Sequence, residues 1–415
     1  MSTECLCDRT AATGSPKLTV AEAEQRLAAS ARRVVGLETL PLEHCEGRIL
    51  AKPVQARLCV PPYDNSAMDG YGFRLRDIRA GEAMHVSQRL PAGAPSVPLL
   101  PLTCVRIFTG APIPPGVNVV VPQEEVSIMP DGRISVLSLP SEGQHIRRAG
   151  EDTMPGKRLL DPGRRLGAVE VGVLASQGLE RVTVYKRLRV ALLTTGNELV
   201  MPGRALECGQ IYNSNRYQLT IALHRLGCEV VATHVADDAD ATRDALSSAA
   251  SGCDLILTTG GVSVGEEDHV RAAVAQQGEI LFAGVAMKPG KPFSLGEVDG
   301  TPLLGLPGNP AASLVTFDIL AAPYIRRLAG ETLPDLQGIP AEASFSMSRT
   351  IPRQQYLHAR LDYSNGKPVA TLAGSQSSGV LSSACAADGY LVIPPYQAVE
   401  RGMTYEFILR VQCRP

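Results

Sequence analysis

Two stretches of the sequence place the same Thr-Thr-Gly arrangement directly after an apolar run. "LLTTGNEL" covers residues 192–199, and "LILTTGGVSVGEED" covers residues 255–268. Each apolar run predicts a buried strand, and ligands of α/β sheets bind at the carboxyl ends of the strands. Glycines at that point let the backbone approach a phosphate, while free N–H groups and the helix dipole favour an anion. Two such loops on neighbouring strands predict an anion pocket.

Both loops also carry carboxylates: Glu198 in the first, and Glu266, Glu267 and Asp268 in the second. A Mg²⁺ ion that bridges substrate phosphates needs one or two carboxylate ligands, so Glu198 and Asp268 are candidates. Helix capping is the alternative, because a carboxylate in the first turn stabilises a helix by up to about 1 kcal/mol. Capping is our interpretation of Glu266 and Glu267, and both interpretations stay open for Glu198 and Asp268.

Two further loops extend the predicted pocket. "AMKPGKPF" presents Lys288 and Lys291 around a Pro-Gly turn, and the proline-braced backbone restricts where the two ammonium groups can lie, which suits a small oxyanion. Solvated turn lysines are the alternative. "LGLPGNPAAS" ends a strand at Gly308 and begins a helix near Pro310. Asn309 is the expected N-cap of that helix, which would offer another set of free N–H groups.

The elements that must position these loops alternate between strand and helix over residues 189–331, which predicts a parallel α/β domain. A buried strand is expected at 189–195, further strands are expected at 229–235, 253–259 and 279–287, and "PLLGLPGNP" leads into a helix. Helices are expected at 213–227, 239–251 and 268–277 and after Asn309.

The flanking segments have a different character. Thr19 and Glu22 form a capping box ahead of an alanine-rich helix, and a second helix is expected near 167–177, packed against the first. Short apolar runs separated by Pro, Gly and Asp predict a mostly β module over 42–143. "LPDLQGIP" is a predicted linker into a small β domain.

The composition bounds the class of protein. The chain has 415 residues, 44% of them hydrophobic and 20% charged, and this composition is typical of several soluble globular units. The net charge of -2 gives no global electrostatic field that would favour nucleic acid or a membrane surface. We expect a cytoplasmic protein, because the start of the chain has no signal-peptide core. Ten cysteines without CxxC pairs are expected to be reduced, with Cys5 and Cys7 as thiols on a loose tail rather than metal ligands.

The motifs in order resemble one family. "SAMDGYG", "TGAPIP", "RRAGED", "TTGNEL", "NSN", "TTGGVSVGEEDHV", "MKPGKP", "GLPGNP" and "SQSSGVLSS" are similar to the signature segments of molybdopterin molybdenumtransferases, the MoeA family related to the C-terminal domain of gephyrin. The resemblance runs from about residue 17 to the C-terminus. So many ordered segments make it specific, although each alone would not.

The resemblance implies a multidomain α/β plus β fold. After the loose tail of residues 1–16, an elongated α+β N-terminal dimerisation domain would comprise residues 17–52 and 144–188, and an inserted β domain residues 53–143. A central three-layer α/β/α domain with a mostly parallel sheet would bind molybdopterin over 189–331. A small C-terminal β domain would follow over 335–415. Such proteins form homodimers whose active clefts receive residues from both chains.

The resemblance also implies an activity. The family takes adenylylated molybdopterin and molybdate, releases AMP in a Mg²⁺-dependent step and leaves molybdenum on the dithiolene sulfurs, as part of molybdenum cofactor biosynthesis. Transient contacts with molybdopterin adenylyltransferase and with proteins that mature downstream molybdoenzymes are expected partners. Rival interpretations are an adenylyltransferase or a nucleotide pyrophosphatase with the same α/β module, which leave the flanking domains unexplained, and a gephyrin-like scaffold.

The catalytic residues implied are Asp268, Asp69, Glu198, Thr109 and Asp237, with Asp268 and Glu198 as Mg²⁺ ligands and Asp238 as the alternative to Asp237. Asp69 and Thr109 would reach the partner's cleft, although Asp-Gly is also a turn signal. Residues expected to bind substrate or anion are Thr195, Gly196, Gly260, Gly261, Ser263, Lys288, Lys291, Gly308, Asn309, Ser313, Arg353, Arg360 and Ser378. For Arg353 and Arg360, ordinary surface arginines of the β domain are the alternative.

One departure concerns the anion. Some family members carry Lys or Arg four residues before the first lysine of "KPGKP", where this chain has Gly284. Either a cationic contact with the anion is missing in this chain, or Lys291 or another residue replaces it. Whether the chain prefers tungstate to molybdate stays open.

Overall fold

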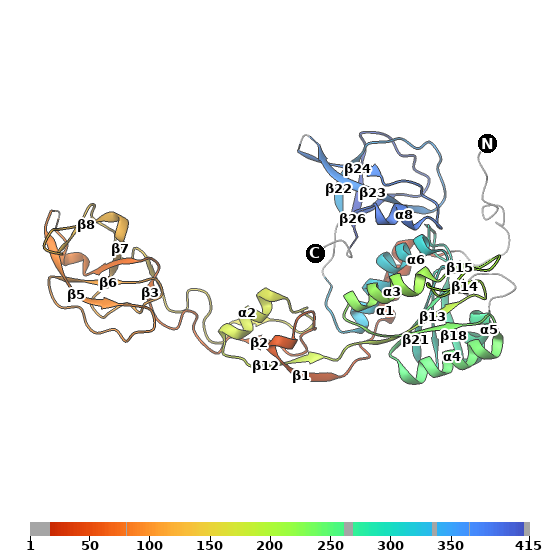
Figure 1. The fold of residues 1–415 in the computed structure, drawn as a ribbon, viewed down its shortest axis with the longest axis horizontal. Coiled ribbons are helices and arrows are strands. Elements are labelled where there is room, and N and C mark those ends of the chain that lie inside the picture. Colours follow the sequence, from red (N-terminus) through yellow and green to blue (C-terminus); the bar gives the residue numbers. More distant parts are fainter. Residues whose placement is uncertain (1–16, 80, 261–268, 334–337, 365, 411–415) are drawn as a thin grey trace.

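The computed structural model describes residues 17–79, 81–260, 269–333, 338–364 and 366–410. The molecule is elongated, with a β-rich unit at one end and a large α/β unit at the other (Figure 1). A multidomain α/β plus β fold, as expected, is observed. Within the described residues, no helix is long and apolar enough to cross a membrane.

The α/β unit is built on a six-stranded sheet in the order β16-β13-β17-β21-β20-β18. The first four strands pair in parallel, and β20 and β18 add an antiparallel edge. The strands in that order are Glu229–Val235, Arg189–Thr195, Leu255–Thr259, Thr301–Leu306, Ser294–Val298 and Gly278–Ala283. Parallel pairing places the carboxyl ends of β16, β13, β17 and β21 at one edge of the sheet, as the alternating pattern predicts.

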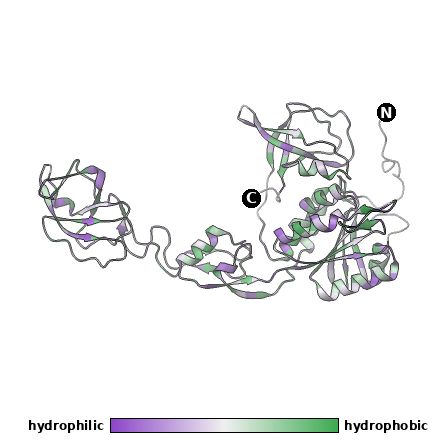
Figure 2. Cartoon of the chain, in the orientation of Figure 1, coloured by the Kyte–Doolittle hydropathy of each residue, from purple (hydrophilic) through white to green (hydrophobic). Residues whose placement is uncertain are grey.

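Helices cover both faces of this sheet, because its strands bury alternate side chains in opposite directions. Val190 and Leu192 of β13 join a cluster with α3 (Ser214–Arg225), α6 (Pro310–Thr316) and α7 (Ala322–Leu328). Ala191 and Leu193 join a second cluster with α4 (Ala239–Gly252) and α5 (His269–Gln277). Both α4 and α5 combine hydrophilic and hydrophobic residues, as helices with one face on a sheet should (Figure 2). A π-helical segment, Phe317–Ala321, joins α6 to α7.

The first helix, α1 (Val20–Ser30), begins with the predicted capping box of Thr19 and Glu22. Its buried side chains belong to the cluster of the α/β unit. The second helix, α2 (Ala168–Ser176), packs through Leu174 into a separate cluster. The expectation that the two helices pack together is therefore wrong. Leu18 forms a β-bridge with Val285, and this pairing fixes α1 beside the α/β unit instead.

Two antiparallel chain segments connect the α/β unit to the far end of the molecule. β1 (Leu37–Pro41) pairs with β12 (Arg181–Tyr185), so that Leu37 lies opposite Tyr185. Two shorter pairs follow the same course: β2 (Val54–Gln55) with β11 (Arg158–Leu160), and β3 (Asn65–Ser66) with β10 (Ile146–Arg147).

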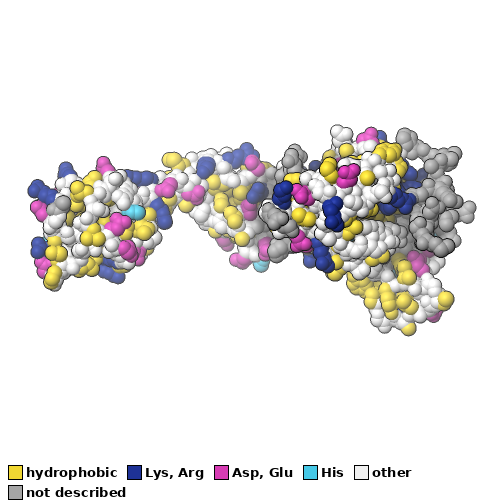
Figure 3. Space-filling model, turned by 90° about the horizontal axis from the view of Figure 1, so that it is seen from above, with side chains coloured by type: hydrophobic (Ala, Val, Ile, Leu, Met, Phe, Trp, Pro, Cys, Tyr) yellow, Lys and Arg dark blue, Asp and Glu magenta, His cyan; other side chains and the backbone are white. Residues whose placement is uncertain are grey.

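The unit at the far end forms a separate lobe (Figure 3). Its sheet has the order β7-β4-β6-β5-β9-β8 and buries one apolar cluster on each face. Those strands are Val119–Pro122, Gly70–Phe73, Thr103–Ile107, Ala83–Leu90, Ile134–Val136 and Val126–Ile128.

The C-terminal β unit takes one strand from the α/β unit. Its sheet comprises β19 (Met287–Lys288), β22 (Ile339–Ala343), β23 (Gln354–Ser364), β24 (Lys367–Leu372), β25 (Gly389–Ile393) and β26 (Thr404–Leu409), with α8 (Leu381–Cys385) beside it. The single strand expected over 279–287 is thus wrong. β18 ends at Ala283 because Gly284 has a φ of 88°, and the chain then enters the other sheet as β19.

Candidate functional site

Three strand-end loops meet at the carboxyl edge of the α/β sheet. Gly260 N–H donates to the carbonyl oxygen of Leu306 over 3.2 Å. A Cβ atom on Gly260 would lie 3.0 Å from Thr195 Oγ1, and a Cβ atom on Gly308 would lie 3.7 Å from Gly260 Cα. The structure therefore brings together Thr195, Gly260 and Gly308, and a side chain on Gly260 would meet the Thr195 hydroxyl.

The loop after β13 folds a carboxylate back over its own glycine. Gly196 has a φ of 142°, and a Cβ atom there would approach Glu198 Oε2 to 2.4 Å. Glu198 is exposed, and a short parallel pair of β14 (Leu199–Val200) and β15 (Ile211–Tyr212) follows it. Glycine at position 196 thus leaves room for the carboxylate at the edge of the sheet.

Asp237 lies in the adjacent loop and faces the same turn. Asn197 N–H donates to Asp237 Oδ2 over 3.0 Å, and Asp237 N–H donates to Asn197 Oδ1 over 3.1 Å. Asp238 instead accepts from Ala241 N–H and caps α4. Of the two candidate aspartates, Asp237 is therefore the one beside the Gly196 turn.

Three asparagines of this edge were missed as site residues. Besides Asn197, Asn213 donates from Nδ2 to Thr194 Oγ1 over 2.8 Å, and Asn215 donates from Nδ2 to the Gly308 carbonyl over 2.6 Å. The Asn-Ser-Asn run at 213–215 could have indicated Asn213 and Asn215 as site residues. The same run is also typical of a helix N-cap, and Asn213 does cap α3. These amides connect the loops after β13 and β21.

The start of α6 differs from expectation. Asn309 stands at the N-cap position, but its side chain donates to Ser378 Oγ over 3.2 Å and makes no capping bond. Ala311 and Ala312 N–H donate to the Ser378 carbonyl over 3.1 and 3.3 Å. The expectation of free N–H groups is wrong at these positions, because a loop of the C-terminal unit occupies them. The loop does bring Ser378 to Asn309.

Ser313 lies one turn into α6 and is fully buried. Its Oγ has no hydrogen-bond partner among the described residues. The structure therefore does not place this predicted anion-binding hydroxyl on an open surface.

The cationic candidates meet near the other end of α6. Lys288 lies in β19 opposite Gln355 of β23, and Gln354 N–H donates to the Ala286 carbonyl over 3.0 Å, which places Arg353 beside the same turn. Val285 N–H donates to the Lys291 carbonyl over 3.0 Å. The structure thus brings Lys288, Lys291 and Arg353 together, and we call these three residues the cationic cluster.

Gly290 fixes this turn against α6. Its φ is 120°, and a Cβ atom there would lie 2.4 Å from Thr316 Cγ2. Thr316 is the last residue of α6. At 1.5 Å per residue, the seven-residue helix spans about 10 Å between Asn309 and Thr316. The glycine-rich loops and the cationic cluster therefore lie at opposite ends of one short helix.

Arg360 is not part of this cluster. It lies five residues beyond Gln355 along β23, about 17 Å away at the rise of a strand. Its Nε donates to the Ala386 carbonyl over 3.0 Å.

Asp69 and Thr109 pair with each other in the far lobe. Asp69 Oδ1 accepts hydrogen bonds from Thr109 N–H over 2.8 Å and from Thr109 Oγ1 over 2.7 Å. These bonds, with a smaller effect of Arg106, lower the pKa of the Asp69 carboxyl. The lobe lies at the end of the molecule opposite the α/β sheet (Figure 1), so one chain does not bring these residues to the strand-end loops.

Several predictions fall outside the described residues: Gly261, Ser263, Asp268, Cys5 and Cys7. The residues that are described hold no group of three or more His, Cys, Asp or Glu side chains able to bind a metal ion. Glu198 and Asp237, on adjacent loops, fit the chemistry of Mg²⁺, which is commonly held by one or two carboxylates together with substrate phosphates and water.

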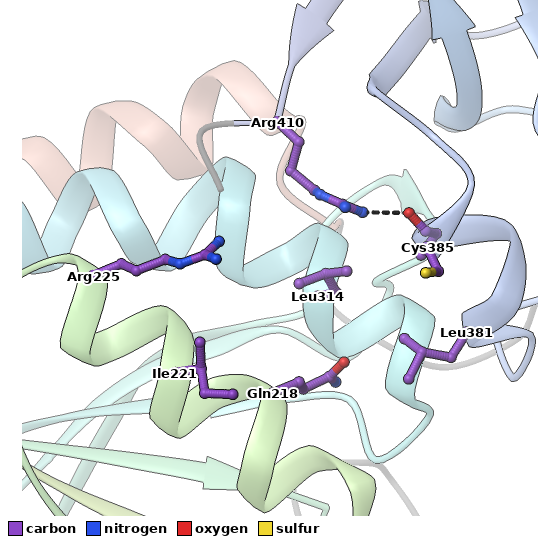
Figure 4. A pocket seen from close by; sticks show the side chains of 8 residues that line it. Gln218, Ile221, Arg225, Leu314, Leu381, Cys385 and Arg410 are labelled. Atoms are coloured by element: carbon purple, nitrogen blue, oxygen red, sulfur yellow. Dashed lines mark hydrogen bonds between the residues drawn. The ribbon is translucent and has the colours of Figure 1, made fainter. Parts of the chain in front are cut away.

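A separate pocket of about 250 Å³ lies between α3, α6 and α8. Arg410 donates there to the Ala384 carbonyl over 2.6 Å, and the arginine lies across the pocket from Arg225 and Gln218 of α3 (Figure 4). The pocket is lined by Gln218, Ile221, Arg225, Leu314, Leu381, Ala384, Cys385 and Arg410, none of which was a predicted site residue.

Comparison with known proteins covers nearly the whole described chain. Residues 18–178 match the MoeA N-terminal region (domain I and II), residues 191–327 match a probable molybdopterin binding domain, and residues 340–409 match the MoeA C-terminal region (domain IV).

Curated relatives and solved structures agree with these matches. The molybdopterin molybdenumtransferase of Haemophilus influenzae is 42% identical over 296 residues, 71% of this chain and 73% of the relative. Molybdopterin molybdenumtransferase 2 of Mycobacterium tuberculosis is 37% identical over 388 residues, 89% and 94% of the two chains. The crystal structure of the molybdopterin biosynthesis moeA protein from Pyrococcus horikoshii aligns with a TM-score of 0.80 and 26% identity, covering 95% of this chain and all of the other. The chain therefore belongs to the MoeA family of molybdopterin molybdenumtransferases and is a transferase.

Proposed function

We propose that this chain transfers molybdenum from molybdate to the dithiolene of adenylylated molybdopterin and releases AMP, in the biosynthesis of the molybdenum cofactor. One observation carries the proposal: glycine-rich strand ends and a cationic cluster lie about 10 Å apart, at the two ends of α6. A substrate with phosphates at one end and a bound oxyanion at the other fits that arrangement.

The strand-end loops would bind the phosphates of the substrate. Gly196, Gly260 and Gly308 allow close approach. The side-chain amides of Asn197, Asn213 and Asn215 hold the loops around them, Asn197 as an acceptor and the other two as donors. Cleavage of a phosphate anhydride needs in-line positioning and charge stabilisation more than a covalent intermediate. Fixed backbone and amide groups at the edge of a sheet supply that positioning.

Glu198, Asp237 and Asp268 would hold Mg²⁺, which neutralises charge on the phosphates when bound. Asp237 already accepts a hydrogen bond from Asn197 N–H, which orients its carboxylate toward the Gly196 turn. Asp268 is our first choice for the metal and for adenylate cleavage, on the resemblance of its motif.

The cationic cluster would bind molybdate, a tetrahedral dianion, through charge-assisted hydrogen bonds. Lys288 is half-buried and pairs through β19 with the strand that follows Arg353, so the two cations are fixed relative to each other. Ser378 bonds to Asn309 at the opposite end of α6, so its hydroxyl would contribute to the glycine-rich end of the site and not to the cationic cluster. Ser313 and Arg360 have no part in this proposal, because Ser313 is buried and Arg360 lies about 17 Å along the strand.

Asp69 and Thr109 would complete the cleft of a partner subunit in a homodimer. Their mutual hydrogen bonds keep the Asp69 carboxyl ionised and fixed on the rim of the lobe. A cytoplasmic location and transient contacts with the adenylyltransferase and with maturation proteins belong to the same proposal.

The test incubates the purified chain with adenylylated molybdopterin, Mg²⁺ and either molybdate or tungstate, and follows AMP release together with metal-loaded cofactor. We expect AMP release that depends on the oxyanion, and its loss in Asp268→Asn and Glu198→Gln. Glu207→Gln, an exposed carboxylate of the α/β unit, is the matched control and should retain wild-type turnover.

AMP release without any oxyanion dependence would instead favour a nucleotide pyrophosphatase. Binding of the substrate without turnover would favour a scaffold, and normal turnover in Asp268→Asn would contradict the catalytic assignment.

A further inference from the structure

The segment that precedes α1, residues 17–19, lies beside the turn that carries the cationic cluster. Leu18 forms a parallel β-bridge with Val285, and Ala286 N–H donates to the Leu18 carbonyl over 2.7 Å. These backbone contacts place Lys17 next to the turn that carries Lys288. The start of the described chain is therefore fixed by pairing with a segment far away in the sequence.

The side chain of Lys17 covers Gly284. A Cβ atom on Gly284 would lie 3.5 Å from Lys17 Cγ, 4.0 Å from Lys17 Cδ and 3.9 Å from the Lys291 carbonyl oxygen. Gly284 also has a φ of 88°, a backbone conformation in which other residues are strained. The place beside Gly284 is consequently filled by the aliphatic part of a lysine from another segment.

The charges of this region interact. Partial burial lowers the pKa of Lys17, and repulsion by Lys291 and Arg353 lowers it further. Repulsion between neighbouring like charges is reduced when an anion binds among them. An anion bound to Lys288, Lys291 and Arg353 would relieve the repulsion of Lys17, so binding there favours an ionised Lys17.

We propose that Lys17 is a further oxyanion-binding residue of the cationic cluster and supplies the cation for which position 284 has no side chain. The proposal rests on the proposed function and adds to it one residue that binds the oxyanion. The ligand class is a tetrahedral dianion such as molybdate or tungstate. The cation is provided by the segment before α1 rather than by the lysine loop.

The test measures the binding of sodium molybdate and sodium tungstate by titration calorimetry, with no molybdopterin present. We compare the wild-type chain with Lys17→Ala, Lys17→Arg, Lys288→Ala and Lys52→Ala. Lys52 is an exposed lysine beside β2 and is the matched control. Loss of a charge-assisted hydrogen bond should weaken binding about tenfold in Lys17→Ala. Lys17→Arg should retain most of the affinity, and Lys52→Ala should bind as the wild type does.

A second readout separates a direct contact from a structural effect. Because a bound dianion would oppose the two cations that lower the pKa of Lys17, binding at alkaline pH should take up protons. Titrations in buffers of different ionisation enthalpy report that uptake, which should be smaller in Lys17→Ala than in Lys52→Ala.

The outcomes separate the two proposals. If Lys288→Ala loses binding while Lys17→Ala keeps wild-type affinity and proton uptake, the role of Lys17 is wrong and the proposed function stands. If the wild-type chain binds neither oxyanion, the oxyanion site of the proposed function fails, and the role of Lys17 fails with it.

Discussion

His358 is a single residue whose titration should affect stability. Its side chain is buried, and neither ring nitrogen has a hydrogen-bond partner within the described part of the chain. Burial, and to a lesser extent the charge of Arg410, lowers its pKa from 6.5 to about 4. The folded chain therefore binds fewer protons than the unfolded chain between these two values, and stability falls as the pH drops from 6.5 toward 4.

We expect His358→Leu to reduce this acid sensitivity, by about 3 kcal/mol between pH 6.5 and pH 4. Leucine also removes the two unpartnered ring nitrogens, so stability at pH 7 should be unchanged or higher. Chemical denaturation at pH 7, 6, 5 and 4 measures the effect. His85→Leu, at an exposed histidine of the far lobe, serves as control and should keep the wild-type pH dependence. Equal acid sensitivity in His358→Leu and the wild type would contradict the assignment.

At the scale of elements, α7 is fixed to the extended segment before α2 by a buried ion pair network. Glu331, just beyond α7, accepts from Arg326 over 2.6 Å and from Arg165 over 2.6 Å. Thr332 N–H also donates to the Gly163 carbonyl. Burial raises the pKa of Glu331, but hydrogen bonds from Arg326 and Arg165 outweigh it and leave the pKa lowered.

Glu331→Gln should destabilise this junction by about 3 kcal/mol, because it leaves two partly buried guanidinium groups without a counter-charge. The contribution of the native carboxylate is present above the unfolded-state pKa near 4.5 and is lost as the pH falls through the lowered folded value. Thermal melting at pH 7 and pH 4 tests both statements. Glu342→Gln breaks an exposed pair with Lys367 and should change stability by less than about 1 kcal/mol. Similar losses in both variants would refute the special role of Glu331.

Elements with a strong local pattern were predictable from the sequence. The runs at 189–195 and 229–235 are observed as β13 and β16 with those bounds. β13 is a central strand with a continuous apolar run, whereas β16 lies at the edge of the sheet and alternates between exposed and half-buried side chains. The run 279–287 has no charged residue after Glu279, yet the chain changes sheets within it. That change depends on the tertiary pairing of β19 with β23.

Some residues of the candidate site could likewise be predicted from the local sequence pattern, and others could not. Gly196, Gly260 and Gly308 follow predicted strands, so their meeting is a consequence of parallel topology. Lys17 could not be found in this way, because its place depends on the bridge between Leu18 and Val285. The prediction of free N–H groups at the start of α6 is wrong for a similar reason. Ser378 of the C-terminal β unit accepts hydrogen bonds from these groups, and the local sequence does not show that contact.

At the scale of the whole molecule, the separation of the far lobe from the α/β unit makes the proposed shared cleft testable by subunit mixing. Asp69→Asn and Glu198→Gln should each abolish turnover alone. In a dimer with one chain of each kind, one cleft receives both native residues, so a random mixture should recover about a quarter of the wild-type activity. Light scattering should show a dimer before and after mixing.

A mixture of Asp69→Asn with Thr109→Ala is the matched control. Both changes lie in the same lobe, so every cleft of their mixed dimers lacks a native residue and no activity should return. Differently tagged subunits identify the mixed dimers of Asp69→Asn with Glu198→Gln. If these mixed dimers stay inactive, a cleft built from two chains is ruled out.

The pairing of β1 with β12 also sets an order in which the chain can fold during synthesis. The strands of the far lobe lie between residues 70 and 136 and can close their sheet as soon as they emerge. Leu37, by contrast, must wait for Tyr185, on the order of ten seconds at ribosomal elongation rates. Leu18 waits longer still, for Val285. The segment with Leu18 and Leu37 therefore emerges before the far lobe but is incorporated after it, and its pairings close long loops at an entropic cost.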